Sequence, residues 1–142
     1  MIVYLVGMPG AGKSVVGREL AARLGVPFVD LDAEIERQHG ASVSDIFSRM
    51  GEASFRAMEA AELVDASAHD PAVVACGGGV VLEPANRITL RNTGITVFLD
   101  VGIDRLRERV PPGADRPLIQ HEGDLEQLLE DQIGRASCRE RV

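Results

Sequence analysis

The sequence predicts an α/β protein with a central parallel sheet and helices on both of its faces. Two observations support this fold class. Short apolar runs rich in β-branched residues alternate with segments of helical periodicity, an order that is typical of parallel strands joined through helices. A glycine-rich loop also joins the first apolar run to the first helical segment. We therefore expect a doubly wound, three-layer arrangement, with strands at residues 2–6, 26–29, 71–76 and 96–99.

The helices are predicted from apolar spacing and from capping residues. Gly25 follows the first helix as a C-cap, and Ser42 is a typical N-cap for the third. The chain of 142 residues is long enough for one domain with a hydrophobic core. The predicted helices are residues 14–24, 33–38, 41–50, 52–68, 84–91, 103–109 and 125–131.

The loop after the first strand matches a phosphate-binding pattern. Residues 7–14 read GMPGAGKS and fit G-x-x-x-x-G-K-[ST], with a strand before and a helix after, as such a loop requires. Its glycines let backbone N–H groups surround phosphates at a helix N-terminus. Lys13 would then reach the β- and γ-phosphates, and the Ser14 hydroxyl would bind Mg²⁺. The alternative is a glycine turn that ends in Lys-Ser by chance.

Lys13 is also the only lysine in the sequence, since the other basic residues are all arginine. Ammonium and guanidinium groups differ in size, hydration and hydrogen-bond geometry. A single exception in a chain that otherwise uses arginine marks a position where the compact ammonium is required. This observation favours nucleotide binding over the chance turn.

Two carboxylates follow the second predicted strand. Asp30 and Asp32 lie where ligands bind in open α/β sheets, at the carboxyl ends of the strands. One could hold Mg²⁺ through water, and the other could orient or deprotonate an acceptor hydroxyl. The alternative is that one of them only caps the next helix.

Three further features have both a functional and a plain structural interpretation. Arg56 is a candidate anion-binding residue, but its spacing also suits a surface ion pair with Glu52 or Glu59. Gly77, Gly78 and Gly79 exceed what a turn needs, which favours close approach of a ligand to the backbone. Arg116 lies in a Pro- and Gly-rich loop that is either a phosphate-covering lid or a simple connection.

Composition excludes several classes of function. A net charge of −7 argues against nucleic acid and anionic membranes as partners. The sequence has neither a long apolar run nor a signal peptide, so we expect a cytoplasmic protein. Its two cysteines form no disulfide or metal-binding pattern.

The last ten residues, IGRASCRERV, are what a common sequencing adapter gives when it is translated. We interpret residues 133–142 as an artefact at the end of a truncated gene and residues 1–132 as the domain. The alternative is a native basic tail.

The motifs GMPGAGKS, FVDLD, GEASFR, CGGGVV and DRPLI together resemble shikimate kinases, in order and in spacing, over residues 1–132. The resemblance implies a P-loop, nucleoside-monophosphate-kinase-like fold with five parallel strands, of which the last is expected to be missing here. It implies ATP-dependent phosphorylation of the shikimate 3-hydroxyl by a monomer that needs Mg²⁺.

The resemblance also assigns residues to roles. Asp32 would bind the shikimate hydroxyls, Arg56 its carboxylate, and residues 77–79 its ring. Asp30 would hold Mg²⁺ through water. A lid at about 110–121 would carry Arg116 onto the ATP phosphates, and Lys13, Asp32 and Arg116 would be the catalytic set. The ATP-binding residues would be Gly10, Ala11, Gly12, Lys13, Ser14, Val15, Arg109 and Arg116.

One family feature is missing. The second carboxylate-binding arginine belongs to an Arg-x-x-Pro-Leu-Tyr type segment, and Arg135 lacks that context, so we do not assign it. Two alternatives stay open: another small-molecule kinase, such as a gluconate kinase, and a non-catalytic shikimate-kinase-like module of a regulator.

Overall fold

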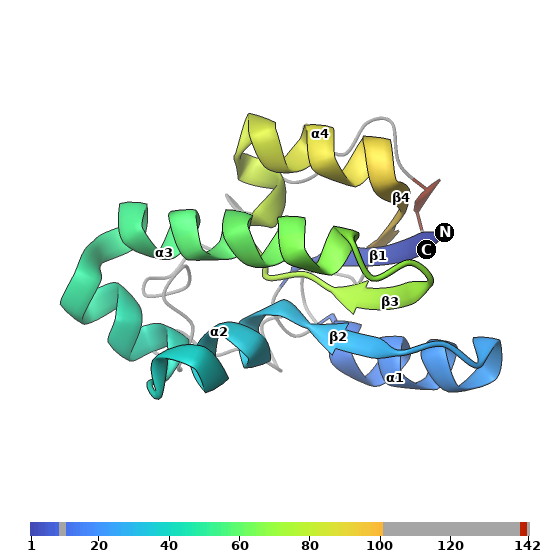
Figure 1. Ribbon diagram of the computed structural model, residues 1–142, viewed down its shortest axis with the longest axis horizontal. Coiled ribbons are helices and arrows are strands. Elements are labelled where there is room, and N and C mark those ends of the chain that lie inside the picture. Colours follow the sequence, from blue (N-terminus) through green and yellow to red (C-terminus); the bar gives the residue numbers. More distant parts are fainter. Residues whose placement is uncertain (9–10, 101–139, 142) are drawn as a thin grey trace.

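The computed structural model describes residues 1–8, 11–100 and 140–141, which form a parallel sheet between two layers of helices (Figure 1). The strand order is β2-β3-β1-β4-β5, and every neighbouring pair is parallel. The α/β fold class is confirmed. The strands are β1 (Ile2–Gly7), β2 (Phe28–Asp30), β3 (Ala72–Ala75), β4 (Gly94–Leu99) and β5 (Glu140–Arg141).

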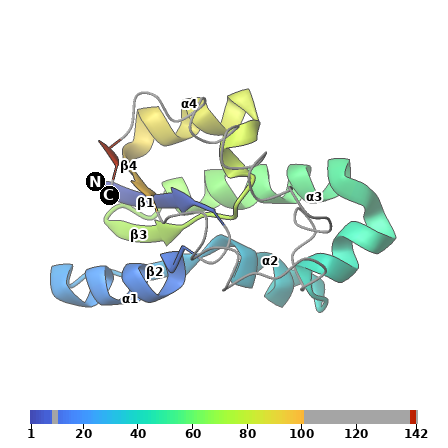
Figure 2. The same cartoon turned by 180° about the vertical axis from the view of Figure 1, so that it is seen from behind.

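The alternation of side chains along β1 explains the two helical layers. Ile2, Tyr4 and Val6 belong to the core cluster under α3 (Val43–Ser67) and α4 (Pro84–Thr93). Leu5 lies in a second cluster, on the face covered by α1 (Lys13–Leu24). Figure 1 and the reverse view in Figure 2 show α1 on one side of the sheet and α3 and α4 on the other. Burial on both faces is expected for a parallel sheet.

The helix predicted at 33–38 begins earlier than expected. It is α2 (Leu31–His39), because Asp30 is its N-cap and accepts a hydrogen bond from the Ala33 N–H at 3.2 Å. Asp30 is therefore a cap, but it is not only a cap, because its other carboxylate oxygen accepts a hydrogen bond from Ser14. Asp32 lies within the first turn of the helix instead of capping it.

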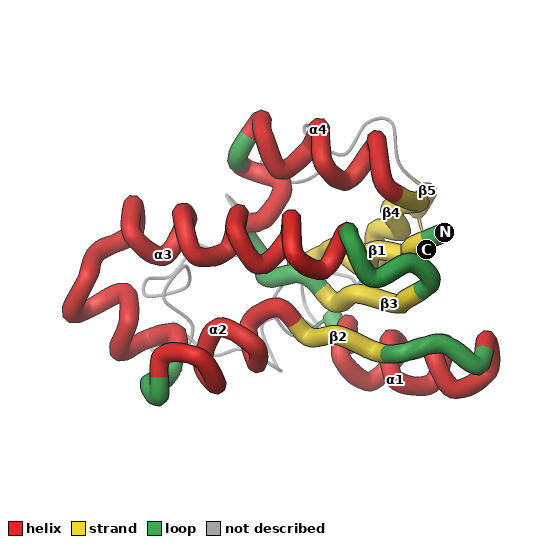
Figure 3. Tube along the Cα trace, in the orientation of Figure 1, coloured by secondary structure: helices red, strands yellow, loops and turns green. Residues whose placement is uncertain are grey.

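The two helices predicted at 41–50 and 52–68 follow each other directly in α3, and between them Gly51 has non-helical backbone angles, φ 83° and ψ 167°. The predicted break is thus present as a sharp bend. Ser42 is the N-cap, as expected, and accepts a hydrogen bond from the Asp45 N–H at 3.1 Å. Figure 3 shows α2 and the first half of α3 beyond the carboxyl ends of the strands.

Two features were not predicted from the sequence. A short 3-10 helix, η1 (Val80–Leu82), follows the glycines, and β4 starts at Gly94 instead of residue 96. Gly94 pairs with Ile2 so closely that a Cβ atom would lie 2.1 Å from the Ile2 carbonyl oxygen.

The fifth position in the sheet is occupied by β5, which has two residues and lies in the segment interpreted as a translated adapter. The helices expected at 103–109 and 125–131, and the lid at about 110–121, lie outside the described residues.

Candidate active site

The phosphate-binding loop leaves the carboxyl end of β1 and leads into α1. Gly12 adopts a left-handed conformation with φ 90°, which glycine tolerates without strain. Among the described residues, no side chain caps α1, so its first N–H groups and the positive end of the helix dipole are available to an anion. Ala11 is buried and Val15 exposed, and Gly10 lies outside the described residues.

The Lys13 side chain folds back over the start of this loop. Its Nζ donates hydrogen bonds to the carbonyl oxygens of Gly7 at 2.8 Å and Met8 at 3.1 Å. The ammonium group is therefore held beside the loop from which it would contact phosphates.

Ser14 and Asp30, the two predicted Mg²⁺ ligands, lie together. The Ser14 hydroxyl donates to Oδ2 of Asp30 at 2.7 Å, while Oδ1 accepts the capping N–H. One carboxylate thus caps α2 through Oδ1 and keeps Oδ2 beside Ser14, so the cap is compatible with the predicted Mg²⁺ role. A hydroxyl and a carboxylate are oxygen donors of the kind that suits Mg²⁺, so the residues present fit the expected ion.

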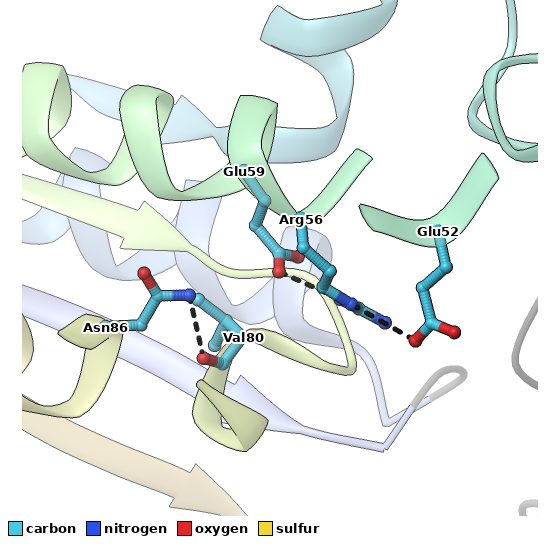
Figure 4. A network of polar contacts seen from close by, with 5 residues as sticks. All are labelled: Glu52, Arg56, Glu59, Val80 and Asn86. Carbon is cyan, nitrogen blue, oxygen red and sulfur yellow. Dashed lines mark hydrogen bonds and ion pairs between the residues drawn. The ribbon is translucent and has the colours of Figure 1, made fainter. Parts of the chain in front are cut away.

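A second group of charged side chains lies on α3. Arg56 and Glu59 are buried, with exposed fractions of 8% and 1%. Arg56 Nη1 donates to Glu59 Oε1 at 2.8 Å, and its Nε is 3.6 Å from Glu52 Oε1 (Figure 4). Both ion pairs proposed as alternatives are present. The expectation that they lie at the surface is wrong for Arg56 and Glu59. Phe47, which precedes the bend in α3, helps to cover Arg56, because the guanidinium carbon lies 5.8 Å from the centroid of its ring.

The glycines after β3 make room for these charged groups. A Cβ atom on Gly77 would lie 2.8 Å from Asp32 Oδ1 and 2.9 Å from Glu59 Oε2. On Gly79 it would lie 2.5 Å from both terminal nitrogens of Arg56. The structure therefore brings Asp32, Arg56 and the glycines into one site. The glycines are therefore also explained without a ligand, because the side chains of Asp32, Glu59 and Arg56 leave no room for a Cβ atom at Gly77 or Gly79.

Glu59 is a member of this site that sequence reasoning recognised only as an ion-pair partner. Burial raises its pKa from 4.5 to about 7, although the Arg56 guanidinium opposes the shift. Within the described residues, Glu59 Oε2 and Arg56 Nη2 are buried without a hydrogen-bond partner. The only sequence signal for Glu59 was its position three residues after Arg56.

The two groups form one site with two halves. Asp30 caps α2 and faces Ser14, whereas Asp32, in the first turn of the same helix, faces the glycines. One half can hold phosphates and Mg²⁺, and the other can hold an anion beside a carboxylate base. Arg109 and Arg116 lie outside the described residues. This fold and this site define a P-loop kinase.

Comparison with known proteins identifies the family. The family model for shikimate kinase matches residues 9–142. The shikimate kinase of Paracidovorax citrulli is 44% identical over 136 residues, covering 94% of this chain and 74% of that protein. That of Gloeobacter violaceus is 49% identical over 134 residues, covering 93% and 74%. The chain belongs to the shikimate kinase family.

Comparison with solved structures also finds shikimate kinases. The shikimate kinase from Acinetobacter baumannii in complex with shikimate is 40% identical, with a TM-score of 0.85 over 96% of this chain and 75% of that one. A gluconokinase from Sinorhizobium meliloti, 22% identical with a TM-score of 0.57, shares the fold.

Within the described residues, every helix is too short or too polar to span a membrane.

Proposed function

We propose that this chain phosphorylates the 3-hydroxyl of shikimate with ATP, giving shikimate 3-phosphate on the route to chorismate and the aromatic amino acids. The observation that carries this proposal is the acceptor half of the site. It combines a buried guanidinium whose Nη2 has no hydrogen-bond partner in the described part of the chain, a wall of glycine backbone, and the Asp32 carboxylate beside that wall. Such a site suits a small carboxylic acid that also carries hydroxyl groups.

The residues of the site would then divide the work of phosphoryl transfer. Arg56 binds the shikimate carboxylate and residues 77–79 contact the ring. Asp32 orients the attacking hydroxyl and accepts its proton. Phosphoryl transfer depends mainly on in-line positioning and charge neutralisation, so these contacts account for much of the rate.

The phosphate half holds the donor. Residues 10–15 surround the ATP phosphates, and Lys13 contacts the β- and γ-phosphates. Ser14 and, through water, Asp30 hold Mg²⁺, which supplies neutralisation of the triphosphate charge when bound. Arg116 is assigned to the lid over the phosphates and Arg109 to the neighbourhood of the adenine, both by family resemblance.

We also propose that the protein acts in the cytoplasm as a monomer, without a nucleic-acid or membrane partner. The net charge of −7 supports the absence of polyanionic partners. A non-catalytic regulator module is less well supported, because Lys13, Asp32 and Arg116 are all present.

A coupled ADP-release assay with shikimate and gluconate as parallel acceptors tests the proposal. We expect Mg²⁺-dependent turnover with shikimate and none with gluconate, at a lower rate for this chain than for the gene product extended to its natural stop codon. Turnover with gluconate alone would replace the substrate. Shikimate binding without turnover in both proteins would favour the regulator module.

A further inference from the structure

The 3-10 helix η1 is fastened to α4 by two consecutive side chains. Asn86 Nδ2 donates to the Val80 carbonyl oxygen at 3.1 Å (Figure 4). Arg87 Nη1 donates to the carbonyl oxygens of Val81 at 2.7 Å and Leu82 at 3.2 Å. Carbonyl groups at the end of so short a helix have no partner within it, so these side chains supply the missing donors.

The same short helix is bonded to the glycines of the acceptor half. The Val80 N–H donates to the Gly77 carbonyl oxygen at 3.2 Å, and the Leu82 N–H donates to that of Gly79 at 3.1 Å. Residues 77–82 thus form one hydrogen-bonded unit. Its front faces the charged side chains of the site, and its back is attached to α4.

The front of this unit has little tolerance for movement. A methyl group on Gly77 or Gly79 would come within 2.9 Å of the charged atoms of Asp32, Glu59 or Arg56. A displacement of the unit by about 1 Å would therefore change the space left for an acceptor. Whatever holds the back of the unit sets this spacing.

Asn86 is suited to that task. Its exposed fraction is 2%, and it bonds Val80, whose side chain is fully buried in the main core cluster. A buried amide that lies behind the site and bonds a backbone carbonyl fixes geometry without contacting a ligand. We propose that Asn86 is a positioning residue for the acceptor half: through η1 it holds residues 77–79 at the correct distance from Asp32 and Arg56. This inference rests on the proposed function for the identity of the acceptor.

The test compares Asn86→Leu with Asn92→Leu. Asn92 lies on the same helix and is exposed, so it is a matched control for the substitution. Asn86→Leu has a similar volume but no donor. We expect KM for shikimate to rise about tenfold and KM for ATP to change less than about twofold, because a lost buried hydrogen bond commonly has an effect of this size. Asn92→Leu should match the wild type in both.

Hydrogen exchange provides a second measurement. The amides of Val80 and Leu82 should exchange faster in Asn86→Leu than in the wild type, while amides of β1 and β3 keep their rates. If Asn86→Leu does not fold, Arg87→Met removes donors from the same unit at a half-buried position and should give the same selective rise in KM for shikimate.

The outcomes separate the two proposals. The positioning role would be overturned if Asn86→Leu raised both KM values equally, or neither, and left exchange at Val80 and Leu82 unchanged. The proposed function would still stand in that case, provided that the wild type phosphorylates shikimate. A wild-type protein that leaves shikimate unphosphorylated would refute the proposed function and, with it, the acceptor named here.

Discussion

At the scale of single residues, Arg56 forms ion pairs with two carboxylates that differ in their exposure to solvent. Glu52 has a side chain that is 62% exposed and lies 3.6 Å away, so water and salt screen that pair strongly. Glu59 is 1% exposed and lies 2.8 Å away. Its charge has lost its hydration, and burial therefore raises its pKa even next to a guanidinium. Because the pKa of Glu59 is raised to about 7, its protonation changes near neutral pH.

Glu59→Gln is predicted to change the pH dependence of stability. The pKa of Glu59 is raised from 4.5 to about 7, so the folded protein binds more protons than the unfolded chain between these values. The free energy of unfolding should fall through this window as pH rises, by about 3 kcal/mol more in the wild type than in the variant. Urea denaturation at pH 5 and pH 8 measures the difference.

The control for this prediction is Glu52→Gln, which removes the other carboxylate beside the same guanidinium. Glu59 is unchanged in that variant, so we expect its curve of stability against pH to keep the fall between pH 5 and pH 8 that the wild type shows. Parallel curves for Glu59→Gln as well would show that the Glu59 carboxyl is not buried as the structure has it.

Asp32→Asn is predicted to lower kcat by about 10³-fold, because it removes the group that we propose orients the acceptor hydroxyl and accepts its proton. ATP affinity should stay nearly unchanged, since the phosphates are assigned to the loop before α1. Steady-state kinetics and nucleotide titration check the two halves separately. Asp65→Asn, at an exposed position of α3, is the control. A collapse of ATP affinity would place Asp32 in the phosphate half.

At the scale of elements, the bend in α3 shapes the acceptor half. The first half of the helix carries Phe47 and the second carries Phe55 and Arg56, and the two rings lie 4.7 Å apart. Both rings flank the guanidinium, at 5.8 and 5.5 Å. A straight helix would not fold Phe47 back onto Arg56 in this way. Gly51 therefore contributes to the site without touching it.

Gly51→Ala is predicted to lower the free energy of unfolding by about 2–3 kcal/mol, because its backbone angles belong to a region that only glycine occupies readily. Gly40→Ala is a matched control, since neither glycine has any atom within 4 Å of an added Cβ. Gly40 has ordinary left-handed angles, so its variant should lose about 1 kcal/mol. Equal losses in chemical denaturation would contradict the role of the bend.

The elements also show how far the sequence could predict the site. The phosphate loop, Asp30, Asp32 and the glycines were found because their chemistry depends on local spacing. Asn86 and the burial of Glu59 were not, because both depend on where α4 and α3 pack against the glycine unit. The start of α2 was missed by two residues, since Asp30 could not be ranked above Asp32 as a cap without coordinates.

At the scale of the whole molecule, strand order creates the crevice. β3 lies between β1 and β2, so the phosphate loop, the two aspartates and the glycines leave neighbouring strands at one edge of the sheet. The chain continues from β1 to a helix on one face, and from β3 to η1 and α4 on the other (Figures 1 and 2). Such a switch point is where open α/β sheets bind ligands. In a chain with net charge −7, two cationic residues, Lys13 and Arg56, belong to the site at this edge, as our proposal of anionic substrates requires.

The last strand gives a prediction about the extent of the domain. Within the described residues, β5 pairs Glu140 with Val97 and Arg141 with Phe98, and it lies in the segment that we interpret as a translated adapter. Deleting residues 133–142 should therefore change the free energy of unfolding by less than about 1 kcal/mol, or less than about 4 °C in Tm. Phe98→Ala, in the buried strand β4, should cost about 3–5 kcal/mol and shows that the assay responds to damage in the sheet. A loss on deletion as large as that of Phe98→Ala would make residues 133–142 a native part of the fold.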